Sequence, residues 1–289
     1  MLTGIIGGIS FGLITPISPL ANDAGSSPMT ITIIRFLLGG LLMGLILLFT
    51  RGSFRVPKGK RLPLLAMSFL IFTVTVFYLS AVVYIPVSLA AILFYTYPII
   101  VTVIDPLLQR RLPSAAQLGL SLLAFTGIAI AMGPSIDNLD WRGIGFVALA
   151  SLSISGTLII SRKVVSEVDN LTIVFYVNII AIGFACPYLL LGSDVAVREI
   201  LQEITPGTIS GLNYAVLIAG LYLLATLAQI ATVGFVGPAR TAMLFNIEPV
   251  VTILAAVVLL NESLTNLQTI GSLLVLSAVV LSCYRPVRV

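Results

Sequence analysis

The sequence of 289 residues contains no histidine, only two cysteines and few charged residues, which make up 9% of the chain. A soluble protein carries roughly a quarter charged residues, so a soluble globular domain is excluded. Cys186 and Cys283 both lie inside or at the end of apolar runs, which argues against a disulfide framework. Without histidine a metal site is not favoured either, and the sequence indicates no cofactor. Nothing resembles a P-loop, so ATP is not an energy source within this chain.

Long apolar runs dominate what is present. Hydrophobic residues form 58% of the chain, and the mean hydropathy is +1.15. Segments of about 20 apolar residues are long enough to cross a bilayer as helices. Ten such spans are predicted, near residues 2–21, 29–50, 62–83, 87–109, 113–133, 142–160, 171–191, 207–230, 238–260 and 266–284. With short loops throughout, the sequence predicts an all-α membrane protein with a single integral-membrane domain over 1–289.

Basic residues are distributed unevenly between the two sets of loops. One set, with the C-terminus, carries eleven: Arg51, Arg55, Lys58, Lys60, Arg61, Arg110, Arg111, Arg162, Lys163, Arg285 and Arg288. The other set carries two, Arg142 and Arg198, among the acidic residues Asp23, Asp137, Asp140, Asp194, Glu199, Glu203 and Glu262. Because cytoplasmic loops are enriched in Lys and Arg, both termini are expected in the cytoplasm. The net charge of +4 is therefore a topology signal and does not indicate nucleic-acid binding.

The ten spans divide into two sets of five, repeat 1 over 1–135 and repeat 2 over 140–289. An offset of 151 residues aligns six identical positions: Ala91, Leu93, Phe94, Pro98, Leu108 and Gln117 with Ala242, Leu244, Phe245, Pro249, Leu259 and Gln268. An odd number of spans per repeat inverts the second copy in the membrane. Inverted repeats are typical of secondary transporters, whose binding site lies at the repeat interface near the bilayer midplane.

Two related pentapeptides, Phe94–Pro98 and Phe245–Pro249, place polar side chains and a proline in the middle of apolar spans. Proline lacks an N–H group and frees the carbonyl four residues back, so Pro98 and Pro249 predict helix breaks. A freed carbonyl in hydrocarbon must be satisfied by protein or by a water-filled cavity. Both pentapeptides are therefore expected to face the protein interior.

At this point the sequence resembles the drug/metabolite transporter superfamily, EamA type, over essentially its whole length. The resemblance is carried by Arg35-Phe36, the run Tyr84–Gln117 with Pro98, Glu248-Pro249, and Asn261-Glu262. It implies two inverted five-helix bundles around a central cavity, and many such proteins export amino acids or related metabolites. The bacterial aromatic-amino-acid exporters are the nearest group by this resemblance. One departure is Arg110-Arg111, where the family often has Glu.

Glu248 is the sharpest candidate for chemistry, because an ionised carboxylate at mid-membrane costs roughly 2.5–3.5 kcal/mol or more. It either binds a substrate ammonium group or a proton that exchanges with it, or it is a protonated structural group beside Pro249. Tyr95 and Asn246 occupy equivalent positions in the two repeats. Helical spacing favours these two as cavity-lining residues, with Tyr97 on the other face of a straight helix. The alternative is a structural role as polar contacts between helices.

A polar stripe along the eighth span, Tyr222, Thr226 and Gln229, is repeated in the third span by Thr75 and Tyr78. A stripe of this kind faces protein or water, either as a binding wall or as interhelical hydrogen bonds. Arg35 is expected near the outer interface, as an anchor or as a ligand for a substrate carboxylate. Asp105 is expected to pair with Arg110 and Arg111, and Arg240 to reach the cytoplasmic surface.

The leading hypothesis is a secondary transporter of the bacterial inner membrane that exports amino acids and related small metabolites. The candidate substrate-binding residues are Tyr78, Tyr95, Tyr222, Thr226, Gln229, Asn246 and Glu248. The expected partners are the small-molecule substrate, the lipid bilayer and, through Glu248, protons. An exporter of drugs or nucleoside-like metabolites is the alternative within the same class. A channel would need a continuous polar path, and an intramembrane enzyme would need several converging ionisable groups at depth, so no enzyme activity is expected.

Overall fold

The computed structural model describes residues 1–24, 28–133, 140–191, 209–260 and 263–284. Every regular element within these ranges is a helix. The helices are α1 (Leu2–Asp23), α2 (Pro28–Phe49), α3 (Lys58–Ala81), α4 (Val87–Phe94), α5 (Tyr97–Leu108), α6 (Ala115–Met132), α7 (Trp141–Val165), α8 (Asn170–Leu191), α10 (Ile209–Val236), α11 (Pro238–Phe245), α12 (Ile247–Leu260) and α13 (Asn266–Tyr284).

Nine apolar spans within the described ranges are long enough to cross a membrane, counting α4 with α5 and α11 with α12 as one span each. The remaining predicted span, 171–191, corresponds to α8, whose apolar stretch is shorter over Asn170–Ala185. The all-α membrane architecture expected from the sequence is therefore confirmed. Cys283 is a half-buried free thiol, and the side chain of Cys186 lies outside the described residues.

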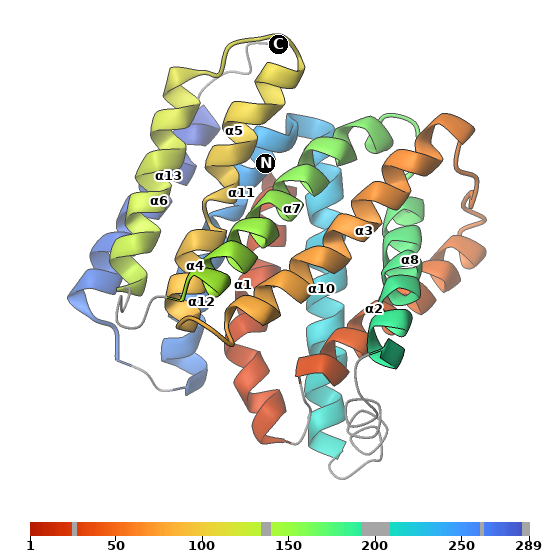
Figure 1. Ribbon diagram of the computed structural model, residues 1–289, viewed down its shortest axis with the longest axis horizontal. Helices are drawn as coiled ribbons and strands as arrows, with labels where there is room; N and C mark the ends of the chain where they lie inside the picture. Colours follow the sequence, from red (N-terminus) through yellow and green to blue (C-terminus); the bar gives the residue numbers. More distant parts are fainter. Residues whose placement is uncertain (25–27, 134–139, 192–208, 261–262, 285–289) are drawn as a thin grey trace.

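The two halves of the chain interdigitate. Helix α1 from the first half packs along α10 and α12 from the second, and α3 packs along α7 and α8 (Figure 1). The last helices of the two halves, α6 and α13, form another pair between the halves. The core therefore consists of contacts between the halves, and its largest buried cluster surrounds Tyr95, Tyr97 and Leu244.

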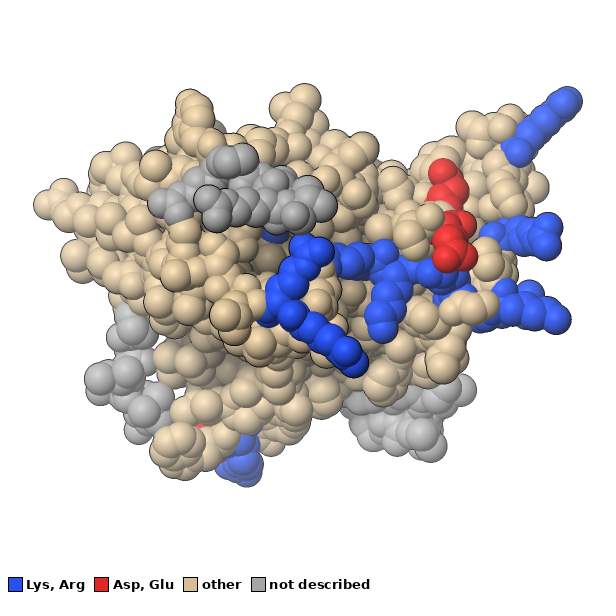
Figure 2. All heavy atoms as spheres, turned by 90° about the horizontal axis from the view of Figure 1, so that it is seen from above, with Lys and Arg blue, Asp and Glu red and all other residues tan. Residues whose placement is uncertain are grey.

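One end of the helical bundle is strongly basic. Lys60, at the start of α3, forms a 2.9 Å ion pair with Glu167 and donates to the Lys163 carbonyl at the end of α7. Seen from this end, Lys and Arg side chains dominate the charged surface (Figure 2). Of the residues in the charge count, Asp137, Asp194, Arg198, Glu199, Glu203, Glu262, Arg285 and Arg288 lie outside the described residues.

Two membrane-embedded charges lie elsewhere than expected. Asp105 on α5 pairs with Arg162 on α7 at 2.9 Å, and not with Arg110 or Arg111. The reason is that α5 ends before these arginines, and Arg110 takes a positive φ of 57° that turns the chain away. Arg240 is only 9% exposed and lines a small second cavity, so it does not extend to the surface.

At the opposite end of α7, Asp140 caps the helix by accepting a 2.9 Å hydrogen bond from the Arg142 backbone N–H. The Arg142 guanidinium also donates to this carboxylate and lies 4.5 Å from the centre of the Tyr84 ring. These hydrogen bonds hold the pKa of Asp140 below its usual range. The start of α7 is thus fixed by a local, solvent-exposed cap.

Candidate functional site

Both pentapeptides interrupt their helices, as the prolines predicted. Helix α4 ends at Phe94 and α5 begins at Tyr97, while α11 ends at Phe245 and α12 begins at Ile247. The offset of 151 residues that aligns the repeats maps both ends of α4 onto both ends of α11. Each proline lies in the first turn of the second helix of its pair, where the missing N–H has no intrahelical partner to lose.

Small hydroxyl side chains of α7 pack against the first break. The hydroxyl oxygens of Thr96 and Ser151 are 2.9 Å apart. The Ser155 hydroxyl donates a hydrogen bond to the Tyr97 carbonyl at 3.4 Å. Ser151 and Ser155 are one helical turn apart and share a face. This face of α7 therefore supplies polar partners where α4 gives way to α5.

Glycines of α1 pack against the second break. A side chain at Gly12 would place its Cβ 2.6 Å from the Glu248 carbonyl oxygen, and one at Gly8 would meet Ile247. The backbone of α1 can approach the start of α12 only because both positions lack a Cβ. Each break thus rests on the first helix of the opposite repeat, through hydroxyls in one case and glycines in the other.

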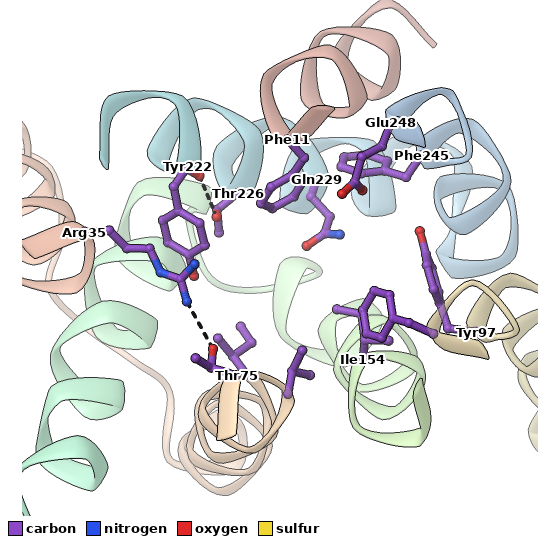
Figure 3. Close-up of a pocket in the computed structure, with 13 residues that line it drawn as sticks. Phe11, Arg35, Thr75, Tyr97, Ile154, Tyr222, Thr226, Gln229, Phe245 and Glu248 are labelled. Carbon is purple, nitrogen blue, oxygen red and sulfur yellow. Dashed lines mark hydrogen bonds between the residues drawn. The ribbon is translucent and has the colours of Figure 1, made fainter. Parts of the chain in front are cut away.

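A cavity of about 180 Å³ lies between these elements (Figure 3). It is large enough to hold several water molecules or a small organic molecule. Its walls come from α1, α2, α3, α4, α5, α7, α10, α11 and α12. The lining residues are Phe11, Arg35, Ile71, Val74, Thr75, Phe94, Tyr97, Ile154, Tyr222, Thr226, Gln229, Phe245 and Glu248.

Arg35 provides the cationic side of the cavity. Its guanidinium donates a 3.0 Å hydrogen bond to the Thr75 hydroxyl and lies 4.5 Å from the centre of the Tyr222 ring. The Phe36 ring is 4.9 Å away. Stacking and the hydrogen bond together fix the plane of the guanidinium, since a cation is attracted to the face of an aromatic ring. The Nε–H of Arg35 is buried without a hydrogen-bond partner among the described residues.

Glu248 provides the acidic side. It lies in the first turn of α12, where backbone N–H groups without intrahelical acceptors favour a carboxylate. The Tyr95 hydroxyl interacts with this carboxyl group as a hydrogen-bond donor. Gln229 and Phe245 flank Glu248 in the cavity wall (Figure 3).

Arg35 and Glu248 lie on opposite sides of the cavity (Figure 3). No ion pair joins them, since the described ion pairs involve other residues. A row of edge-to-face aromatic contacts runs along the wall between them, from Phe36 to Tyr222, then to Phe11, then to Phe245, with centroids about 6 Å apart at each step. The cavity is therefore cationic on one side, acidic on the other and aromatic between.

A comparison with protein-family models identifies this architecture. A model of the EamA-like transporter family matches residues 1–133 and again residues 141–284. The chain belongs to the EamA-like transporter family. It is thus a multi-pass membrane transporter of the drug/metabolite transporter superfamily, with one copy of the family domain in each half.

Comparison with solved structures shows that this fold also occurs in another protein. A solved crystal structure shares the fold of this EamA-like transporter across 96% of each chain, with a TM-score of 0.75 and 17% sequence identity. No sequence among the curated proteins matches.

Four of the seven candidate residues named from the sequence line the cavity of this transporter: Tyr222, Thr226, Gln229 and Glu248. The first three come from the polar stripe of α10. The Thr226 hydroxyl donates a 2.8 Å hydrogen bond to the Tyr222 carbonyl one helical turn back. The structure thus brings the stripe and the second break to one site.

Tyr95, Tyr78 and Asn246 lie outside the cavity lining. Tyr95 is 6% exposed and packs behind the wall against Glu248, whereas Tyr97 lines the cavity. The expectation that favoured Tyr95 over Tyr97 assumed a straight helix, and the break between the two residues changes the direction of the side chains. Tyr78 packs edge-to-face on Phe94 at 5.4 Å, and Asn246 is buried beside the Met243 sulfur at 3.6 Å.

Several lining residues carry no distinguishing mark in the sequence. Phe11, Ile71, Val74 and Ile154 are single apolar residues in apolar spans, so only the fold reveals their position. Arg35 was expected near the outer interface, but the structure places its guanidinium against Tyr222 in the cavity. A lone arginine within an apolar span is the sequence feature that indicates a position in the protein interior.

Proposed function

We propose that this EamA-like transporter is an alternating-access exporter of amino acids, including aromatic and other amphipathic ones, and of related small metabolites. It acts in the bacterial inner membrane with both termini in the cytoplasm. The basic end of the bundle supports this orientation, since Lys and Arg accumulate on the cytoplasmic side. The direction of transport follows from the family resemblance.

The observation that carries the proposal is the charge arrangement of the cavity. A carboxylate at Glu248 can bind an ammonium group, and a guanidinium at Arg35 can bind a carboxylate. The aromatic row between them matches an apolar or aromatic side chain. Binding sites of this kind combine a mainly apolar lining with a few placed polar groups, which set the orientation of the ligand.

Counterflow in proteoliposomes tests the proposal. Vesicles loaded with one unlabelled amino acid should accumulate the labelled form transiently and saturably, whereas a channel would give nonsaturating conductance. The panel includes amino acids, nucleosides and cationic drugs, each with and without a proton gradient. Counterflow of drugs or nucleosides with none of any amino acid would replace the proposed substrate class and leave the transporter assignment intact.

Direction is tested in cells. Cells that overproduce the protein should tolerate a toxic analogue such as fluorophenylalanine better than cells that produce Glu248→Gln. Greater sensitivity of the overproducing cells would indicate uptake and contradict export.

A further inference from the structure

The cavity contains one basic and one acidic side chain that do not pair with each other. Arg35 is held by Thr75 and Tyr222, and Glu248 by Tyr95 and the start of α12. Each side chain therefore has its own supporting contacts on its own side of the cavity. The side chains of both residues face one space in Figure 3. Neither is positioned to satisfy the other.

A cavity of this volume can hold water that solvates both side chains, and a bound ligand would displace that water. A ligand that covers a buried charge without pairing it leaves that charge desolvated, which is strongly unfavourable. A ligand with an ammonium group alone would satisfy Glu248 and leave Arg35 unpaired. A carboxylate alone would do the reverse. Only a ligand with both charges satisfies the site.

The spacing of the two charges adds a second requirement. Two aromatic ring contacts, Tyr222 to Phe11 and Phe11 to Phe245, occupy the wall between the Arg35 side and the Glu248 side. The ammonium and carboxylate of a simple α-amino acid are attached to the same carbon. A ligand in which an apolar spacer separates the two charged groups can follow this wall and meet both sides of the cavity at once.

We infer that Arg35 and Glu248 form a two-point site for a charge-separated zwitterion, with the anionic group at Arg35, the cationic group at Glu248 and an apolar spacer along the aromatic wall. This inference rests on the proposed function and narrows its substrate class. Amino acids with a terminal side-chain ammonium, ω-amino acids and short peptides have this form. The free Nε–H of Arg35 adds a donor beside the anionic group.

A length series tests the inference in the full-length protein. Proteoliposomes are assayed for counterflow of labelled γ-aminobutyrate, δ-aminovalerate and ε-aminocaproate. Glycine, β-alanine, aminooctanoate, hexylamine and hexanoate serve as competitors. The half-inhibitory concentration should pass through a minimum at an intermediate length. At that length the zwitterion should compete about 10- to 100-fold better than hexylamine or hexanoate, because each unpaired charge loses a charged hydrogen bond.

Two variants separate the ends of the site. Arg35→Gln should remove the advantage of the zwitterion over hexylamine, and Glu248→Gln should remove its advantage over hexanoate. A general loss of folding would not produce these opposite changes in selectivity. Arg142→Gln, at an exposed arginine on α7, is the matched control and should retain the wild-type pattern. If Arg35→Gln does not fold, Thr75→Val provides a milder change, with about a threefold to tenfold loss of discrimination expected from one hydrogen bond.

The outcomes distinguish the inference from the proposed function. Saturable counterflow of α-amino acids, with a flat length series and equal competition by hexylamine, would overturn the two-point site and leave the transporter proposal standing. No saturable counterflow of any amino acid by the wild type would overturn both.

Discussion

The Thr252 hydroxyl donates a 3.0 Å hydrogen bond to the carbonyl of Gly12, one helical turn beyond Glu248. The bond joins α12 of the second repeat to α1 of the first. At the same contact between α1 and α12, Gly12 lies very close to α12. A Cβ atom added at Gly12 would be 2.6 Å from the Glu248 carbonyl oxygen and 2.7 Å from the Val251 Cβ. The position of the acidic side of the cavity is therefore set by α1.

Gly12→Ala should displace the first turn of α12 and weaken transport. Overpacking of this kind typically costs about 1–3 kcal/mol, and the displacement moves Glu248 relative to Arg35. The measurement is the concentration for half-maximal counterflow together with the thermal unfolding temperature. Gly220→Ala is the control, since nothing lies within 4 Å of a Cβ there. An unchanged transport constant in Gly12→Ala would mean that α1 does not position Glu248.

Glu248→Gln should abolish or strongly reduce transport, because the amide cannot pair with an ammonium group or exchange a proton. Any residual activity should lose its dependence on pH between about 5 and 8, the range in which a tuned carboxyl group acts. The control is Glu167→Gln, which removes a half-exposed surface ion pair with Lys60. A folded Glu248→Gln protein that transports at the wild-type rate throughout this range would leave only the structural role.

The ion pair between Asp105 and Arg162 should respond asymmetrically to substitution. The Asp105 side chain is 6% exposed and that of Arg162 is 37% exposed. Arg162→Met leaves a buried, unpaired carboxylate and should lower the free energy of unfolding by up to about 3 kcal/mol. Asp105→Asn leaves an arginine that can turn to solvent, and should cost less than about 1 kcal/mol.

The double variant completes the cycle. Asp105→Asn with Arg162→Met should be more stable than Arg162→Met alone, because the buried charge is gone. The stabilities of the variants are ranked by denaturation in detergent, with the loss of monodisperse protein as the measured signal. Equal effects of the two single substitutions would contradict the burial difference.

Labelling of single cysteines tests the orientation. In a Cys186→Ser, Cys283→Ser background, Gly59→Cys at the start of α3 should react with a membrane-impermeant thiol reagent only after the membrane is opened. Asn22→Cys, near the end of α1 at the other end of the bundle, should react in intact cells. Gly59 suits this purpose because a Cβ there meets nothing within 4 Å. The opposite pattern would place the basic end outside.

The sequence predicts much of this fold, because proline and periodicity act locally. Pro98 and Pro249 impose breaks through their own chemistry, so the ends of α4 and α11 follow from the sequence alone. The polar stripe of α10 was also visible, because an apolar helix with polar groups at helical spacing must bury them in protein or water. These features do not depend on distant partners.

The face of each broken helix could not be predicted in the same way. The directions of Tyr95 and Tyr97 depend on the backbone between them, which forms a turn that belongs to neither helix. The position of Arg35 in the cavity could not be predicted either. Thr75 and Tyr222, which hold its guanidinium there, come from helices distant in sequence. Asp105 pairs with Arg162 for the same reason, because helix packing outweighs proximity along the chain.

The correspondence between the two breaks has a consequence for the transport cycle. If the repeats were equivalent, the inward-open and outward-open forms would be related by a two-fold rotation about an axis in the membrane plane and would bind a ligand equally well. Tyr97 stands where the second repeat has Glu248, so this equality is lost. Because the free energies around a closed cycle must sum to zero, unequal affinities at the two membrane faces require the inward–outward equilibrium to differ between the empty and the loaded carrier. The single carboxylate therefore allows ligand binding itself to shift the side of the membrane that the carrier faces.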